Sequence, residues 1–390
     1  MRPGVCTLAL LAVLAAPAQP PVRRGGGQWE REVKGTVHAA GAERLKLTSA
    51  GRLIVRPAPG RQTDIVYTWV QRTAAGSEAD ALELLEQARL RSRSAAGWCI
   101  VDAEAPGGLI QSELTVLVPA GLRHYVFELA SGSLSVRGLN GDVTAFTGAG
   151  AVDMDEIRGS VTARSGGGAM NFGKIGGSLR CLSAGGSIHA DQTGGEAVLE
   201  SAGGEIRLRE AAGPVRASTS GNIHIGKSGG AVSAHTAGGL IEVGGAEGVV
   251  TAESAGGPIF IGRARGVRAE SASGGIRMEG ISGVVRASTA AGNIFLSLGA
   301  ENPRGDAFLA SGRGDITVTI PPQAALTVKA LNESGSWYSR VVSDFPEVRM
   351  PDLSRAGARR AVLAEGAING GGPALLLSVS NGSVYLRRAK

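Results

Sequence analysis

Apolar and polar residues alternate along most of this chain, and from Leu134 onward the alternation repeats with an almost constant period. One kind of segment carries two apolar residues separated by one other residue, and it recurs about every 18 residues. Its pairs are Leu134/Val136, Val152/Met154, Met170/Phe172, Ile188/Ala190, Ile206/Leu208, Ile223/Ile225, Ile241/Val243, Ile259/Ile261, Ile276/Met278, Ile294/Leu296 and Ile316/Val318. Because residues two positions apart on a β-strand point to the same face, each segment predicts a strand with one buried row.

A second kind of segment lies between these strands and usually reads Val-x-Ala-x-Ser/Thr. It occurs at Val143/Ala145/Thr147, Val161/Ala163/Ser165, Val215/Ala217/Thr219, Val232/Ala234/Thr236, Val250/Ala252/Ser254, Val267/Ala269/Ser271 and Val285/Ala287/Thr289. Glycine-rich corners, often Ser-Ala-Gly-Gly, join the two kinds, and Gly is the commonest residue with 61 copies. Tight corners favour Gly because it has no Cβ atom. We therefore expect two strands and two corners in each repeat.

Repeats of this kind predict an all-β fold, a β-helix-like solenoid of about ten coils over residues 131–320. One coil cannot bury its inward row, but coils stacked about 4.8 Å apart share backbone hydrogen bonds and one narrow core. The Ser and Thr residues beside the corners are expected to satisfy amide groups of the turns. Cys181 stands where other coils have Ala, so we expect a small buried residue there.

Residues 28–130 and 321–390 are less regular, and we expect them to cover the two ends of the stack, whose strand edges would otherwise be exposed. One helix is predicted from Ser77 to Arg93, because Ser77 is a good N-cap, acidic residues crowd its start and arginines crowd its end. Its buried face is expected to hold Ala81, Leu82, Leu85 and Ala88. Strands are expected at 29–34, 44–48, 53–56, 64–71, 98–102, 111–118, 325–331, 335–342, 374–380 and 383–387, with a proline-rich segment at 345–353.

The N-terminal residues 1–18 predict a signal peptide. A positive start precedes an apolar stretch from Val5 to Ala16, and Ala16-Pro17-Ala18 has the small-x-small pattern of a cleavage site. Cleavage near Ala18 would leave a flexible leader at 19–27. No later apolar run approaches the roughly 20 residues that a membrane helix needs. We therefore expect a secreted or periplasmic protein without a membrane span.

Composition and motifs narrow the chemistry further. The net charge is +6, but the arginines are scattered among glutamates, so a nucleic-acid partner is not expected. The five His residues show no metal-ligand spacing, and the glycine repeat lacks the regular Asp of a calcium-binding roll, so no metal or cofactor is expected. An extracytoplasmic location would permit a disulfide between Cys99 and Cys181, and the sequence leaves their pairing open.

An enzyme is the alternative that a β-helix invites, because polysaccharide lyases and glycosidases use this fold with carboxylates gathered on one face. The candidate acids are Asp153 and Asp155, which are close in sequence, and Glu200, Glu253 and Glu270, which fall at equivalent outward positions. Ser218 and His235 occupy the positions between them and dilute the acids. A solvated charged face is therefore favoured over a catalytic centre.

The outward positions of the first strand kind are chemically irregular, which argues against the flat threonine array of an ice-binding surface. Six of them would stack as one column of rings and cationic groups: His189, Arg207, His224, Phe260, Arg277 and Phe295. Exposed rings beside cationic groups suit contact with sugars or acidic polymers. Ordinary residues of a sheet face are the alternative interpretation.

Three features together resemble a known family: the Gly-x-Ile and SAGG array, the segment LTVLVPAG from Leu114 to Gly121, and the segment SNGSVYLR from Ser380 to Arg387. They are similar to the DUF4097 family of bacterial β-strand-repeat adhesins, and the resemblance extends roughly from Trp29 to Arg387. It implies an extracytoplasmic β-helix-like protein with an adhesive role, and it supplies no catalytic residues.

The sequence thus predicts a non-enzymatic binding module of the cell envelope that recognises a polysaccharide or a surface protein along a strand face. A polysaccharide-active β-helix enzyme is the first alternative. A structural or signalling partner in envelope stress is the second.

Overall fold

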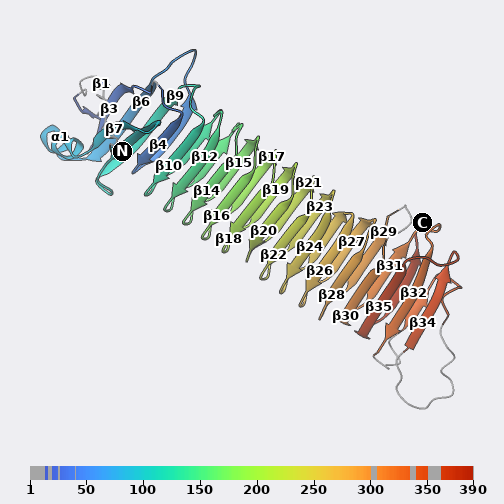
Figure 1. Ribbon diagram of the computed structural model, residues 1–390. Coiled ribbons are helices and arrows are strands. Elements are labelled where there is room, and N and C mark those ends of the chain that lie inside the picture. Colours follow the sequence, from blue (N-terminus) through green and yellow to red (C-terminus); the bar gives the residue numbers. More distant parts are fainter. Residues whose placement is uncertain are drawn as a thin grey trace, which may run out of the picture. The chain divides into compact units, whose positions relative to one another are not determined.

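The computed structural model describes residues 14–15, 20–24, 27–39, 41–299, 305–333, 340–349 and 362–389. The chain divides into two compact units, residues 1–194 and 195–390. The described residues form 36 strands and one helix, so the protein is predominantly β (Figure 1). Most of the predicted signal peptide, most of the strand expected at 335–342 and the end of the proline-rich segment lie outside the described residues.

In unit 1, sheet A contains six parallel strands and one antiparallel strand at its edge. Its strands lie in the order β7 (Arg89–Ala95), β8 (Trp98–Glu104), β4 (Arg44–Ser49), β10 (His124–Leu129), β12 (Asp142–Thr147), β14 (Val161–Ser165) and β16 (Leu179–Ser183). From β10 onward each strand pairs with the second strand after it in the chain. The chain therefore leaves sheet A after every strand and returns to it one repeat later.

Sheet B of unit 1 receives the strands in between. Its order is β3 (Gln28–Val37), β6 (Ile65–Ala74), β9 (Ile110–Val118), β5 (Arg52–Pro57), β11 (Leu134–Arg137), β13 (Val152–Asp155), β15 (Met170–Ile175) and β17 (Ile188–Thr193). The strands from β9 to β17 are parallel, whereas β3 and β6 are antiparallel to their neighbours. The two-residue strands β1 (Leu14–Ala15) and β2 (Val22–Arg23) pair with β3.

The first parallel strands of unit 1 do not follow the order of the chain. β4 lies between β8 and β10 in sheet A, and β5 lies between β9 and β11 in sheet B. The early pair β4 and β5 is therefore enclosed on both sides by strands from later in the sequence. Beyond them, β7 pairs antiparallel with β8, and β6 pairs antiparallel with β9 and β3. The parallel ladders therefore end at β8 and β9.

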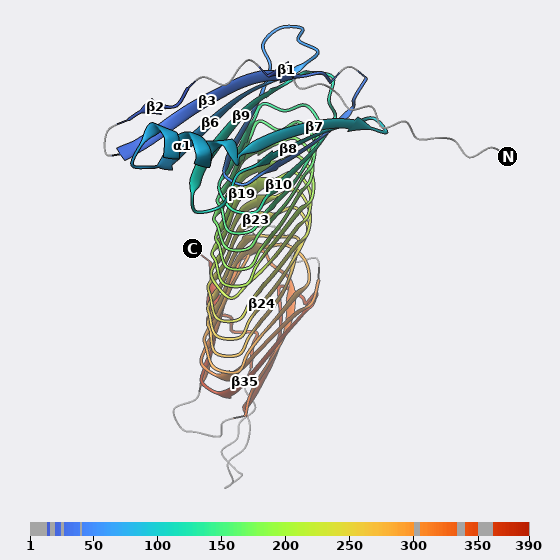
Figure 2. The same ribbon diagram turned by 90° about the vertical axis from the view of Figure 1, so that its left-hand side faces the viewer.

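The single described helix, α1 (Glu78–Glu86), packs on β6 and β3 in unit 1 (Figure 2). Ser77 caps it as predicted, because its hydroxyl accepts a hydrogen bond from the Asp80 amide. The helix ends at Glu86 and not at Arg93, which corrects the prediction. The guanidinium of buried Arg31 donates to the Leu85 carbonyl and to Gln71 Oε1, the latter at 2.8 Å, and so holds the helix end.

The arginines that were expected to close the helix lie on β7 instead. Arg89, Arg91 and Arg93 alternate with half-buried residues and are exposed, and β7 pairs antiparallel with β8 over its full length. The period-two pattern of this segment therefore prevails over its helix-favouring charges. Leu82 is a second correction, because it is exposed, whereas Ala81 and Leu85 are buried as expected.

In unit 2, sheet A again alternates with sheet B along the chain. Its order is β18 (Ala197–Ser201), β20 (Val215–Thr219), β22 (Val232–Thr236), β24 (Val249–Ser254), β26 (Gly266–Ser271), β28 (Val285–Thr289), β30 (Ala307–Arg313), β35 (Ala374–Asn381), β32 (Leu326–Asn332) and β34 (Val362–Ile368). All neighbours are parallel except β32 and β34. The antiparallel strand β34, which the sequence did not predict, covers the edge of β32.

Sheet B of unit 2 has the order β19 (Ile206–Ala211), β21 (Ile223–Ser228), β23 (Ile241–Ala246), β25 (Ile259–Arg263), β27 (Ile276–Ile281), β29 (Ile294–Leu298), β31 (Ile316–Ile320), β36 (Val384–Arg388) and β33 (Val341–Ser343). The late strands β35 and β36 thus lie inside their sheets. They separate β30 from β32 and β31 from β33.

The inward rows that the sequence predicted are confirmed. Every apolar and hydroxyl residue named for the two strand kinds is buried, with at most 7% of its surface exposed. Like residues stack on like: Ile223, Ile241 and Ile259 are successive register partners, as are Ala217, Ala234 and Ala252. Parallel pairing in constant register therefore buries one continuous row per strand position in each unit.

Candidate functional site

Five of the six residues of the predicted column lie in unit 2, on the outward face of sheet B. Successive strands bring the following residues into direct register, and we call them the B column: Arg207, His224, Glu242, Phe260, Arg277, Phe295, Thr317 and Tyr385. The sixth residue, His189, is exposed on β17 of unit 1, where its register partner is Asn171. The structure thus aligns the five unit 2 residues, and the role of His189 stays a prediction.

The charged end of the B column is neutralised by glutamates. Arg207 Nη2 lies 2.7 Å from Glu205 Oε1, and this hydrogen bond raises the pKa of the Arg207 guanidinium above its ordinary value. His224 lies between two acids, with Nε2 3.3 Å from Glu205 and Nδ1 2.9 Å from Glu242. Rotamers and local contacts decide such pairs, so strand periodicity could not reveal them. This end offers paired charges, and it is not a cationic patch.

The other end of the B column carries the rings. Phe260 is 42% exposed. Arg277 follows it in register, and the Arg277 guanidinium carbon lies 4.8 Å from the centre of the Phe295 ring, a cation–π contact. Arg277 Nε also donates to Glu279 at 2.6 Å. Phe260, Arg277 and Phe295 thus place two rings and a guanidinium in one row of the outward face.

A groove on sheet A of unit 2 was not predicted from the sequence. It has a volume of about 970 Å³ and crosses the strands from β18 to β35 near their ends. We call it the A groove, and its lining residues at the corners are mostly small: Ala202, Ser220, Ala237, Ala255, Ala272, Ala290 and Gly312 each follow an inward hydroxyl residue, and Ser380 follows Val379. The groove exists because each of these corner positions lacks a long side chain.

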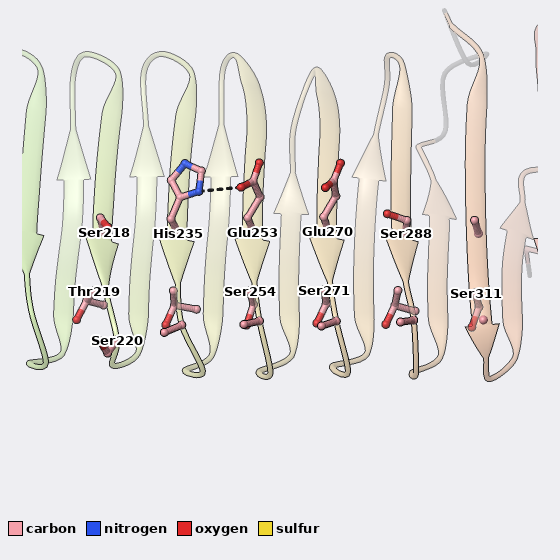
Figure 3. A pocket seen from close by; sticks show the side chains of 18 of the residues that line it. Ser218, Thr219, Ser220, His235, Glu253, Ser254, Glu270, Ser271, Ser288 and Ser311 are labelled. Atoms are coloured by element: carbon pink, nitrogen blue, oxygen red, sulfur yellow. Dashed lines mark ion pairs between the residues drawn. The ribbon is translucent and has the colours of Figure 1, made fainter.

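One row of the A groove carries its charges. His235, Glu253 and Glu270 are successive register partners on β22, β24 and β26 (Figure 3). Ser218 precedes them on β20, and Ser288 follows them on β28. His235 Nδ1 lies 3.2 Å from Glu253, and Arg268 Nη2 lies 2.8 Å from Glu270. Glu270 therefore has a cationic neighbour at the surface, and Glu253 has an imidazole neighbour.

A ladder of hydroxyl groups lies beneath the groove, as the sequence predicted. Thr236 Oγ1 accepts a hydrogen bond from the Gly239 amide at 3.0 Å and donates to the Gly221 carbonyl of the preceding corner at 2.8 Å. Thr219 bonds in the same way, with Gly221 N as donor at 3.1 Å and Gly204 O as acceptor at 2.6 Å. These inward hydroxyls are fully engaged in joining corners, which supports their structural role.

Ser233, His235 and Glu253 are connected in the order of a nucleophile, a base and an orienting carboxylate. Ser233 Oγ lies 2.9 Å from His235 Nε2, and His235 Nδ1 is the nitrogen that faces Glu253. Acyl transfer also needs donors directed at a developing oxyanion. However, β22 is a central strand whose backbone pairs with β20 and β24, so its amides are already used. We interpret these contacts as orienting His235 beside the groove.

The register confirms the expected order of the acids. Ser218 and His235 lie between Glu200 and Glu253, and Glu270 follows Glu253 directly. In unit 1, Asp155 Oδ1 accepts from the amides of Glu156 and Lys174, at 2.9 and 3.0 Å. Asp155 therefore has a structural role in a corner. Among the described residues no group of His, Cys, Asp or Glu has the arrangement of a metal site.

Both described cysteines are free thiols in unit 1. Cys99 lies on β8 and Cys181 on β16, at distant positions of sheet A, so the disulfide that the sequence left open is not formed. Burial raises the pKa of the Cys99 thiol to about 11 and that of the Cys181 thiol well above its ordinary value. Cys181 is fully enclosed in the row where other strands have Ala, as predicted.

Comparison with known proteins gives no family. No family model matches the chain, so its resemblance to DUF4097 stays a prediction, and no curated protein matches it. One similar solved structure is a putative adhesin from Bacteroides fragilis, with 13% identity, a TM-score of 0.28, and coverage of 67% of this chain and 95% of its own. Another is a putative cell adhesion protein from Clostridium sporogenes, with 9% identity, a TM-score of 0.19, and coverage of 92% and 100%. Neither likeness supports an inference about the function of this chain.

Proposed function

We propose that the repeats of both units are coils of a β-solenoid. The support is the alternation of the chain between sheets A and B, with each repeat strand pairing in parallel with the second strand after it. The constant register of the buried rows points the same way. In such a fold the outward faces of the two sheets present regular rows of side chains to solvent.

We further propose that the protein is a non-enzymatic binding module of the cell envelope, which recognises a polysaccharide or a surface protein along the B column. The observation that carries this proposal is the register of Phe260, Arg277 and Phe295, with the guanidinium stacked on a ring. Exposed aromatic and arginine side chains supply most of the affinity in many interfaces. Because Arg207, His224 and Arg277 all have glutamate partners, the rings are expected to dominate recognition.

A secreted or periplasmic location is part of this proposal. It rests on the signal-peptide pattern of residues 1–18, which the described residues do not include. Within the part of the chain that the structure describes, no helix has the length and apolar character needed to cross a bilayer.

Co-sedimentation with insoluble envelope polymers tests the binding role. Residues 19–390 are mixed with the polymer, and the pelleted fraction is measured for the parent, for F260A/F295A and for F308A. Phe308 is 45% exposed on sheet A and so serves as a matched control for loss of a surface ring. Because an aromatic anchor contributes about 2 kcal/mol or more, we expect at least tenfold weaker binding by the double variant alone. Equal pelleting of all three proteins would remove the B column from the proposal.

The supernatant of the same experiment tests the alternatives. Release of soluble sugar that is abolished by E253Q or E270Q would replace the binding module with a polysaccharide-active enzyme. Neither pelleting nor sugar release would favour a protein partner, which fits either a surface protein bound at the B column or the structural or signalling alternative.

A further inference from the structure

The A groove is a surface feature of unit 2 that the B column does not explain. Its polar row passes in register through Ser218, His235, Glu253, Glu270 and Ser288, and the lining continues along the same sheet to β35. Eight strands at a spacing of about 4.8 Å give it a length of roughly 34 Å. A ligand that fills the groove must therefore be extended.

We infer that the A groove is a second binding site and that its ligand is a linear, uncharged glycan. The lining offers hydroxyl, carboxylate and imidazole groups at regular intervals, and these groups bind sugar hydroxyls by hydrogen bonds. Arg268 compensates the charge of Glu270, and the imidazole of His235 faces Glu253. An uncharged chain fits this balance better than a polyanion or a polycation does.

An extended peptide fits the groove less well than a glycan. A peptide strand usually gains its affinity by backbone hydrogen bonds to the free edge of a sheet. The A groove crosses central strands, whose backbone groups already bond to the neighbouring strands on both sides. A peptide in the groove would leave its own amides without backbone partners, whereas a glycan needs only the side-chain groups that line it.

The second site goes beyond the proposed binding role, because the A groove and the B column belong to different sheets of unit 2. One protein could then hold a glycan on sheet A and another polymer or protein on sheet B. Failure of one site leaves the other unaffected, so the two proposals are tested separately.

The test is binding of residues 19–390 to an array of immobilised linear glycans that includes neutral, acidic and amino-bearing chains, together with extended peptides. A255W fills the A groove at an exposed Ser-Ala-Gly-Gly corner. A184W places the same side chain at the same corner position of unit 1, outside the groove, and is the matched control. E253Q/E270Q changes the polar row without changing its volume.

We expect the parent to bind neutral glycans. A255W and E253Q/E270Q should bind them at least tenfold more weakly, whereas A184W and F260A/F295A should bind as the parent does. Binding of the parent to no neutral glycan, or equal binding by A255W and A184W, would overturn the inference. Binding only to acidic glycans, or only to peptides, would overturn the choice of ligand and with it the site proposed here.

Discussion

At the scale of single residues, the hydroxyl groups at the corners connect one repeat to the next. Thr236 is buried, yet its oxygen has both an amide donor and a carbonyl acceptor, and Thr219, Ser254 and Ser271 are bonded in the same way. A buried polar group without partners would cost free energy, so this pairing is what allows a hydroxyl in the core. Val would fill the same space but would leave the amide and the carbonyl of two corners unsatisfied.

We therefore predict that Thr236→Val lowers the free energy of unfolding by about 1–3 kcal/mol. The substitution keeps the volume of the side chain but leaves buried polar groups without hydrogen-bond partners. Denaturant unfolding followed by circular dichroism measures the change. Thr251→Val is the matched control, since Thr251 is only half-buried on the neighbouring strand. An equal effect of the two substitutions would show that the ladder contributes nothing specific.

At the scale of elements, each Ser-Ala-Gly-Gly corner uses its two glycines differently. In the related corner at 237–239, a Cβ atom on Gly238 would meet nothing within 4 Å. A Cβ atom on Gly239 would lie 2.1 Å from the carbonyl oxygen of Gly221 in the preceding corner. The second glycine is thus required by the close approach of stacked corners, whereas the first faces open space.

This difference predicts that Gly239→Ala is destabilising and Gly238→Ala is nearly neutral. The added methyl group at position 239 forces neighbouring backbone apart, which costs about 1–3 kcal/mol or more. Thermal unfolding of the two variants beside the parent is the measurement. Similar melting temperatures for both variants would contradict the stacking argument.

At the scale of the whole molecule, the C-terminal strands of unit 2 complete its sheets from within. β35 and β36 each have a parallel neighbour on both sides. If they leave, the strands β30, β31, β32 and β33 lose those neighbours and present open edges. Open edges are templates for pairing with other chains.

A charge inside β35 tests this role. Leu377 is 2% exposed, whereas the adjacent Leu376 is 38% exposed on the other face of the same strand. Leu377→Asp should cost about 3–5 kcal/mol as an unpaired buried charge and release the strand. We expect it to increase self-association relative to the parent in light scattering at rising concentration, while Leu376→Asp does not. A parent-like profile for Leu377→Asp would contradict the edge argument.

Much of the fold could be predicted from the sequence. The alternation of apolar and polar residues predicts which side chains point inward, and the constant repeat length predicts which residues become register partners. The row of Ile223, Ile241 and Ile259 is an example. Alternation does not predict which strands become neighbours in a sheet. The enclosure of β4 by β8 and β10, and of β35 by β30 and β32, therefore had no signal in the pattern.

The candidate site, too, could be predicted only in part. The repeat length alone predicts one column of Arg207, His224, Phe260, Arg277 and Phe295, and their register is confirmed in unit 2. The pairing of this column with Glu205 depends on rotamers, which periodicity does not describe. No sequence pattern predicts the A groove. Small side chains at the corners produce it, but tight turns favour small residues at these positions whether or not a groove is present.

The enclosed position of β35 and β36 also decides how unit 2 resists a mechanical load. A pull on the chain beyond Arg388 acts on β36, which is bonded to β31 on one side and to β33 on the other. Both ladders are parallel to the pulled strand, so their hydrogen bonds are loaded together in shear and cannot be opened one after another from a free edge. Unit 2 is therefore built to bear tension at its C-terminal strand without peeling.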